Sequence, residues 1–153
     1  MIKHNSIYKE LGEERKRLQA EGKLPLWVTT PSWQILKEKY TTDSCPDLYS
    51  IYKRISIAAA KHMGAEEEHY KKVFFNLMWN GWLACSTPVL ANMGEGRGCP
   101  VSCSGSFVED NVYDFYDSQK EIAILSKNGF GTSSYLGDIR ERGTPISAGG
   151  FAS

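Results

Sequence analysis

Hydrophobic residues in the first half of the chain recur at helical spacing, whereas polar residues fill the positions between them. Leu48, Tyr52 and Ile55 fall on one face of a helix, together with Ala59 one turn later. Pro31 after Thr30 is typical of the first turn of a helix, and Gly22 and Gly64 are expected stops. We therefore predict a helical layer over residues 1–84, with helices at 6–22, 30–40, 43–64 and 65–84.

The pattern changes in residues 85–153, which are rich in glycine and serine. Residues 86–92 are expected to lead into a glycine-bearing loop at 93–98. A strand is expected at 101–108, a helix capped by Asp110 or Asn111 at 112–126, a second strand at 132–136 and a charged turn at 138–143. This order predicts an α/β fold built on a βαβ unit. One such unit cannot close its own sheet, so a stop at Ser153 is expected to be premature.

Composition narrows the classes of protein to which the chain can belong. Among its 153 residues, 18 basic and 18 acidic side chains cancel, which argues against a protein built mainly to hold nucleic acid. A hydrophobic content of 41% is that of a globular protein. The sequence has neither an apolar run near the roughly 20 residues that span a bilayer nor a secretory h-region. A cytoplasmic protein without membrane partners is expected.

Four cysteines are too few and too scattered for a disulfide scaffold in a chain of this length. Cys103 lies among small residues in Val-Ser-Cys-Ser-Gly-Ser, which would let a ligand reach its thiol. A redox or catalytic thiol is one interpretation, and a buried structural cysteine is the commoner one. Zinc binding by Cys99 and Cys103 is a weaker hypothesis, because no second close pair completes the site; the other candidate ligands are Cys45, Cys85, His4, His62 and His69.

A glycine-flanked segment and two arginines form a further candidate site. Gly129-Phe130-Gly131 lacks the third glycine of a dinucleotide fingerprint, so a helix stop is the simpler interpretation. The backbone amides of Lys127-Asn128-Gly129, with the guanidinium groups of Arg140 and Arg142, offer donors that could bind phosphate. Exposed arginines in a turn are more often only solvated, so both interpretations stay open: a phosphate-binding site and a solvated turn.

Four segments, taken in order, resemble the large catalytic (alpha) subunit of class I ribonucleotide reductase. They are Ser86-Thr87-Pro88, Pro100-Val-Ser-Cys-Ser-Gly-Ser106, Ser126-Lys-Asn-Gly-Phe-Gly-Thr-Ser133 and Asp138-Ile-Arg140 with Arg142-Gly143. The resemblance covers nearly the whole chain. It implies the helical region before the catalytic barrel, followed by the opening part of a ten-stranded α/β barrel at residues 85–153.

The resemblance also implies roles for residues at the substrate. Cys103 matches one of the two reductant cysteines that deliver electrons to the ribonucleotide and end as a disulfide. Thr87 and Ser102 match residues that hold the substrate, and Asn128 and Gly129 lie where the family's backbone approaches it. Hydroxyl groups beside a thiol can hydrogen-bond an anionic ligand without blocking it. No metal ligand is implied in this chain.

Two charged residues match the family's allosteric specificity site, which binds ATP or deoxynucleoside triphosphate effectors. Asp110 matches the residue at the effector ribose, and Arg140 matches a contact to its phosphates. The helix at 112–126 matches the one through which two alpha subunits dimerise. Its apolar face is therefore expected to be an interface between copies.

The resemblance implies partners as well. The family's radical-bearing loop, its second reductant cysteine and its C-terminal cysteine pair have no match in this sequence. A complementary C-terminal alpha fragment is expected to supply them, as in the split subunits of some bacteriophages, which would act in the host cytoplasm; a truncated product is the other reading. A beta subunit with a di-metal radical cofactor and a thioredoxin- or glutaredoxin-type reductant are also implied. The alternative function is a non-catalytic nucleotide-binding regulatory module.

Overall fold

A computed structural model describes residues 2–96 and 98–152. The chain divides into two compact units, one ending at Pro100 and the other beginning at Val101. Each unit is described by itself. None of the helices in the described ranges is long and apolar enough to cross a membrane.

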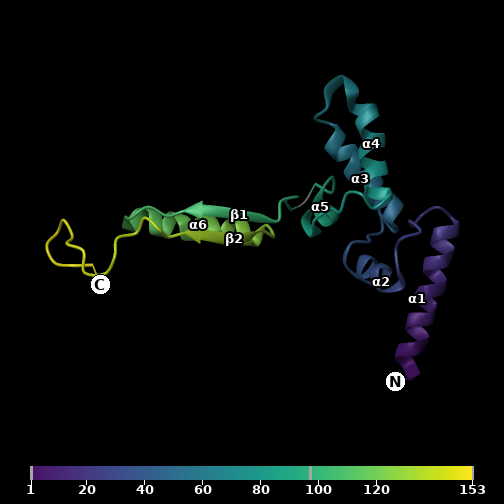
Figure 1. Ribbon diagram of the computed structural model, residues 1–153, viewed down its shortest axis with the longest axis horizontal. Helices are drawn as coiled ribbons and strands as arrows, with labels where there is room; N and C mark the ends of the chain where they lie inside the picture. The colour runs from purple at the N-terminus through teal and green to yellow at the C-terminus, as the bar shows by residue number, and fades with distance from the viewer. Residues whose placement is uncertain (1, 97, 153) are drawn as a thin grey trace. The chain divides into compact units, whose positions relative to one another are not determined.

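The first unit is helical, as predicted (Figure 1). It contains α1 (Ile2–Ala20), α2 (Thr30–Lys39), α3 (Leu48–Ala60), the short 3₁₀ turn η1 (Gly64–Glu66), α4 (Glu67–Trp79) and α5 (Thr87–Asn92). The first helix begins at Ile2 rather than at the expected residue 6, so Ser6 lies inside the helix. The Ser6 hydroxyl donates to Glu10 Oε1 at 2.9 Å, one turn further along α1.

The core of this unit is built around α3, whose apolar face is the predicted one. Leu48, Tyr52 and Ile55 are all buried, and they pack with residues of α1, α2 and α4. Asp47 fixes the start of α3 through a capping box in which its carboxylate accepts from Ser50 N at 2.8 Å. Trp33 is the largest of the fully buried side chains, with 1% of its surface exposed.

The predicted helix at 65–84 is wrong in its extent, since α4 ends at Trp79. Gly81 follows with φ +76°, a backbone conformation that favours glycine and stops the helix. A Cβ at Gly81 would lie 3.4 Å from the indole nitrogen of Trp27, which itself donates to the Trp79 carbonyl at 2.8 Å. A side chain more than fifty residues away therefore covers the end of α4, a contact that the local pattern does not reveal.

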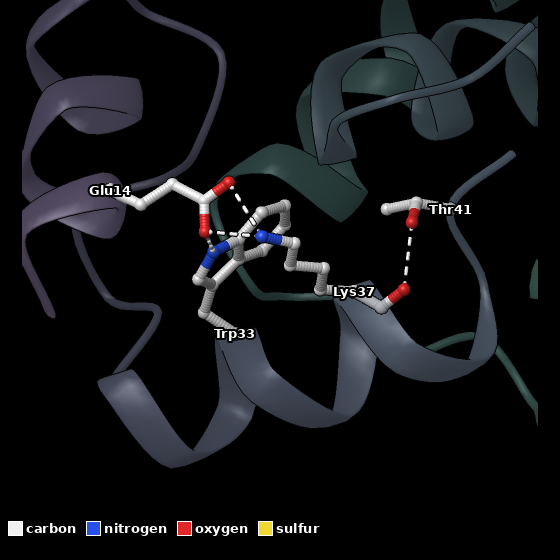
Figure 2. A network of polar contacts seen from close by, with 4 residues as sticks. All are labelled: Glu14, Trp33, Lys37 and Thr41. Carbon is white, nitrogen blue, oxygen red and sulfur yellow. Dashed lines mark hydrogen bonds and ion pairs between the residues drawn. The ribbon is translucent and has the colours of Figure 1, made fainter. Parts of the chain in front are cut away.

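A polar network joins α1 to α2 (Figure 2). Glu14 accepts two hydrogen bonds from Lys37 Nζ, at 2.9 and 2.7 Å, and one from the indole nitrogen of Trp33 at 3.2 Å. Thr41 closes the network by donating to the Lys37 carbonyl at 2.7 Å. The buried Trp33 ring thus has its one polar atom satisfied, as a core tryptophan requires.

Residues 86–92 do lead into a turn, as expected, and within them Thr87–Asn92 form the short helix α5, which the sequence pattern did not predict. Pro88 suits the first turn of α5, because a backbone N–H at that position would have no partner within the helix and proline lacks one. Arg54 of α3 holds its C-terminal end: Nη2 donates to the Leu90 carbonyl at 2.6 Å, and Nη1 lies 3.0 Å from Glu95 Oε1. The second contact is an ion pair without hydrogen-bond geometry, and both side chains are largely buried. We call Arg54 and Glu95 the α3 clamp.

The second unit has the predicted order of strand, helix and strand: β1 (Cys103–Phe107), α6 (Val112–Lys127) and β2 (Gly131–Tyr135). The two strands are parallel, with Cys103 opposite Gly131 and Phe107 opposite Tyr135. Helix α6 lies along the strand pair (Figure 1). Of the two predicted caps, Asn111 is the one used, accepting from Asp114 N at 2.8 Å.

Candidate functional site

The parallel register sets the layout of the candidate site in the second unit. Because β1 and β2 run in the same direction, their first residues, Cys103 and Gly131, lie side by side at one end of the pair. Ser102 directly precedes β1, and Asn128 and Gly129 precede β2. Three of the four predicted substrate-binding residues therefore lie with Cys103 where the strands begin, and the residues that follow the strands lie at the other end.

Cys103 is an exposed free thiol at the start of β1. The Gly131 amide donates to the Ser102 carbonyl at 2.7 Å, which holds the two strand starts together. A Cβ at Gly131 would lie 3.7 Å from Cys103 Sγ and 3.4 Å from the Ser102 carbonyl oxygen. Glycine therefore leaves open a space beside the sulfur that any other residue would fill.

The two faces of the strand pair differ in chemistry. On the face toward α6, the buried Ser106 donates to Glu121 Oε2 at 2.8 Å, and Thr132 lies 3.4 Å from the Ser126 hydroxyl. Side chains alternate along a strand, so Cys103 shares the opposite face with Gly105 and Phe107. Residues 105–107 and 133–135 line a shallow hollow of about 450 Å³, and this lining does not include Cys103. The thiol face carries glycines beside Cys103 and ends at the stacked rings of Phe107 and Tyr135, 5.5 Å apart.

Asn128 and Gly129 form the turn between α6 and β2. Asn128 caps α6, with its side-chain amide donating to the Ile124 carbonyl at 2.9 Å. Gly129 has φ +90°, and its amide donates to the Ser126 carbonyl at 3.0 Å. The side-chain amide of Asn128 and the backbone amides of Asn128 and Gly129 thus all donate to carbonyls of α6.

Asp110 and Arg140 follow the two strands and meet at the other end of the pair. Arg140 Nε donates to Asp110 Oδ2, and Arg140 Nη2 lies 3.4 Å from the Asp110 carbonyl oxygen. About a third of each side chain is exposed. The two residues are 30 positions apart in the sequence, and the fold makes them an ion pair that an anionic ligand would have to share.

Thr87 belongs to the first unit, so its surroundings are separate from those of the other candidates. It is the first residue of α5 and is exposed. Its hydroxyl lies 3.0 Å from the hydroxyl of Tyr40, which ends α2. Sequence reasoning did not select Tyr40, and no motif links it to Thr87, because 47 residues separate the two.

The other cysteines have different surroundings. Cys45 is buried, and Cys85 is half-buried with its thiol 3.3 Å from the sulfur of Met78. Burial raises the pKa of the Cys85 thiol above its usual value, which disfavours the reactive thiolate. Among the side chains that the structure describes, those of residues 6–96 and 98–152, no three of His, Cys, Asp or Glu gather into a set that could hold a metal ion; His4 lies outside them. The zinc hypothesis therefore finds no ligand set in that part of the chain.

Comparison with known proteins gives consistent matches. Residues 27–98 match the family model described as the ribonucleotide reductase all-alpha domain. The ribonucleoside-diphosphate reductase large subunit of Invertebrate iridescent virus 6 is 30% identical over 77 residues, which cover 50% of this chain and 8% of that protein. The ribonucleoside-diphosphate reductase subunit alpha of Helicobacter pylori (strain J99) is 29% identical over 93 residues, which cover 59% of this chain and 12% of that protein.

A solved structure agrees with these sequences. The class Id ribonucleotide reductase alpha subunit of Actinobacillus ureae matches 82% of this chain with a TM-score of 0.70 and 32% identity. The match covers 24% of that alpha subunit. The chain thus spans less than a quarter of the length of these proteins.

Proposed function

Because the chain belongs to the ribonucleotide reductase large-subunit family, we propose that it supplies the opening part of a catalytic large subunit that reduces ribonucleoside diphosphates at the 2′ carbon. The observation that carries this proposal is the position of Cys103. Its thiol is exposed at the start of β1, beside the space left by Gly131, on the sheet face opposite α6. A thiol so placed is open to a substrate.

The reaction balances with one thiol from this chain and one from elsewhere. Cys103 and a second thiol, carried by the rest of the large subunit, lose two electrons and two protons and form a disulfide. The ribonucleotide gains a hydrogen at the 2′ carbon, and its 2′ hydroxyl leaves as water. An external dithiol of the thioredoxin or glutaredoxin type then reduces the disulfide. Without that second thiol and an external reductant, the chain cannot turn over.

The substrate's diphosphate would be held by hydroxyl and amide donors. Ser102 adjoins the thiol, and the turn at Asn128 and Gly129 lies at the same end of the strands. Thr87 of α5, in the first unit, is proposed as a further hydroxyl contact to the substrate. Hydroxyls suit a phosphate, because they donate hydrogen bonds without adding bulk. The amides of Asn128 and Gly129 would have to exchange their α6 carbonyls for the phosphate. No metal is needed from this chain for that contact.

The ion pair of Asp110 and Arg140 would serve as part of the specificity site for ATP or deoxynucleoside triphosphate effectors. The carboxylate suits a ribose hydroxyl and the guanidinium suits a phosphate. Its place after the strands, away from the thiol, supports separate effector and substrate sites. A regulatory module would use this ion pair without Cys103, so the test below distinguishes the two functions.

We propose three partners for the chain. The remainder of the large subunit would extend the strand pair. A beta subunit would carry the di-metal radical cofactor, which supplies the oxidising equivalent that starts the reaction. A second alpha chain would pack on α6, where Tyr113, Tyr116 and Ile124 are exposed. Exposed aromatic and aliphatic side chains on one helix favour such an interface.

The test replaces each cysteine by serine in the large subunit reconstituted with the remainder of its barrel and the beta subunit. Cys103→Ser is expected to assemble and bind nucleotides while multiple-turnover formation of deoxynucleotide disappears, because a hydroxyl cannot supply electrons. Cys45→Ser, Cys85→Ser and Cys99→Ser should keep most activity, apart from packing losses of roughly 1 kcal/mol. Sustained turnover by Cys103→Ser would overturn the proposal. Effector binding without any turnover by the unaltered chain would instead favour the regulatory module.

A further inference from the structure

We propose that Tyr40 is a positioning residue that orients the Thr87 hydroxyl toward the phosphates of a ribonucleoside diphosphate. The inference rests on the proposed function, in which Thr87 contacts the substrate. It adds a residue of the helical unit that neither the sequence motifs nor the comparisons single out. Its basis is the 3.0 Å contact between the two hydroxyl oxygens.

Both ends of this contact are anchored. Tyr40 ends α2, with its amide donating to the Leu36 carbonyl at 2.9 Å, and its half-buried ring packs against the core. Thr87 begins α5, whose far end is held by Arg54 at the Leu90 carbonyl. A tyrosine with a packed ring and a hydroxyl at its tip is well suited to present one polar atom at a fixed point. The contact therefore joins two anchored elements, so the Thr87 hydroxyl is held in one position when a ligand binds.

The number of protons available determines which of the two hydroxyls donates when a phosphate is bound. Each hydroxyl carries one proton, so one of the two donates and the other accepts. Ionised phosphate oxygens only accept hydrogen bonds. When Tyr40 donates to Thr87 Oγ1, the Thr87 proton is left to point away from Tyr40 and donate to such an oxygen. The opposite arrangement would turn a lone pair of Thr87 toward the phosphate, which is unfavourable.

The contact of Tyr40 with Thr87 would affect substrate binding and not the chemical step, because the phosphates do not react. Loss of the Tyr40 hydroxyl would leave Thr87 free to rotate and would weaken substrate binding. It would leave the thiol chemistry at Cys103 untouched. The signature of Tyr40 is therefore a change in KM with little change in kcat.

The experiment is a double-mutant cycle in the reconstituted enzyme, with Tyr40→Phe, Thr87→Ala and the double variant assayed on a ribonucleoside diphosphate. Tyr40→Phe keeps the packed ring, and we expect it to raise KM by about two- to tenfold, the range for one hydrogen bond. In the Thr87→Ala background, Tyr40→Phe should have no further effect, because the hydroxyl that it orients is gone. Tyr8→Phe is the matched control: Tyr8 is 48% exposed on α1.

The outcomes separate the inference from the function on which it rests. If Thr87→Ala raises KM while Tyr40→Phe does not, or if the two effects add in the double variant, the positioning role is overturned and the substrate contact stands. If Thr87→Ala leaves KM unchanged, the proposed substrate contact fails and the role of Tyr40 fails with it. If Tyr40→Phe lowers the thermal stability and leaves KM unchanged, Tyr40 has a structural role only, and the positioning role is overturned.

Discussion

The two units of the chain bury their apolar side chains to very different degrees. In the part of the chain that the structure describes, the first unit holds eleven of the twelve buried hydrophobic residues, and the second holds Val108 alone. The second unit exposes large apolar side chains on each of its elements: Phe107, Val112, Tyr113, Tyr116, Ile124 and Tyr135. The first unit thus carries its own source of stability. The second resembles one layer of a larger assembly, whose strand edges and helix face remain available for pairing.

The largest expected effect tests the core of the first unit. Trp33→Ala removes a side chain that is 99% buried and should lower the free energy of unfolding by about 3–5 kcal/mol. Denaturant unfolding followed by far-UV circular dichroism measures this. Trp82→Ala is the matched control, since that ring is 81% exposed and its loss should change the free energy by less than about 0.5 kcal/mol. Equal effects would contradict the assignment of the core.

Hydrogen exchange sharpens the contrast between the units within one intact chain. Amides of α3 should exchange at least roughly a hundredfold more slowly than those of β1 and β2, because opening α3 disrupts the buried core. Two strands without a covered second face have little to protect them. Mass spectrometry of peptides from residues 48–60 and 103–107 gives the comparison. Comparable protection in the two segments would show that the second unit is stable by itself.

A smaller effect concerns the ion pair of the second unit. Loss of a charged contact in a nucleotide site costs on the order of 1–3 kcal/mol. Asp110→Ala should therefore weaken the effector-dependent choice of substrate in the reconstituted enzyme more than it weakens basal turnover. Competition between two ribonucleoside diphosphates, with and without effector, measures it. Asp43→Ala, at an exposed aspartate of the first unit, is the control, and an unaltered effector response in Asp110→Ala would remove this ion pair from the site.

The smallest effect is the acid dependence of the link between α1 and α2. Burial acts to raise the pKa of Glu14, but hydrogen bonds from Lys37 and Trp33 outweigh it, and the pKa lies below the ordinary 4.5. A depressed carboxyl pKa stabilises the fold above the unfolded-state value, and that stabilisation is lost as the pH falls through the lower, folded-state pKa. Glu14→Gln should therefore flatten the acid side of the stability profile of the first unit. Glu13→Gln, at the exposed neighbour, should leave the profile unchanged.

Local signals made most of the helices predictable from the sequence. The buried face of α3 follows from the spacing of its apolar residues, and the start of α6 follows from Asn111. The end of α4 and the existence of α5 depend instead on distant partners. Trp27 covers Gly81, and Arg54 holds Leu90, across separations of 54 and 36 residues. Because those contacts form only after the chain has folded, a pattern confined to one segment cannot reveal them.

The candidate site also has features that the local sequence predicts and features that depend on contacts between distant residues. The small residues around Cys103 predicted an accessible thiol, and the thiol is exposed at the start of β1. The register that sets Gly131 beside it depends on strand pairing across α6, which the sequence indicates only as strand, helix and strand. The pairing of Asp110 with Arg140 and the contact of Tyr40 with Thr87 have no local signature at all.

The α3 clamp has a consequence for how the first unit responds to ionic strength. Arg54 and Glu95 have only 12% and 17% of their side chains exposed, whereas the ion pair of Lys23 with Glu21 is 50% and 40% exposed. At about 1 M salt the Debye length falls to roughly 3 Å, which screens the exposed pair and largely spares the buried one. Added salt should therefore loosen the α3 clamp, and with it the segment after α5, much less than it loosens the exposed ion pair.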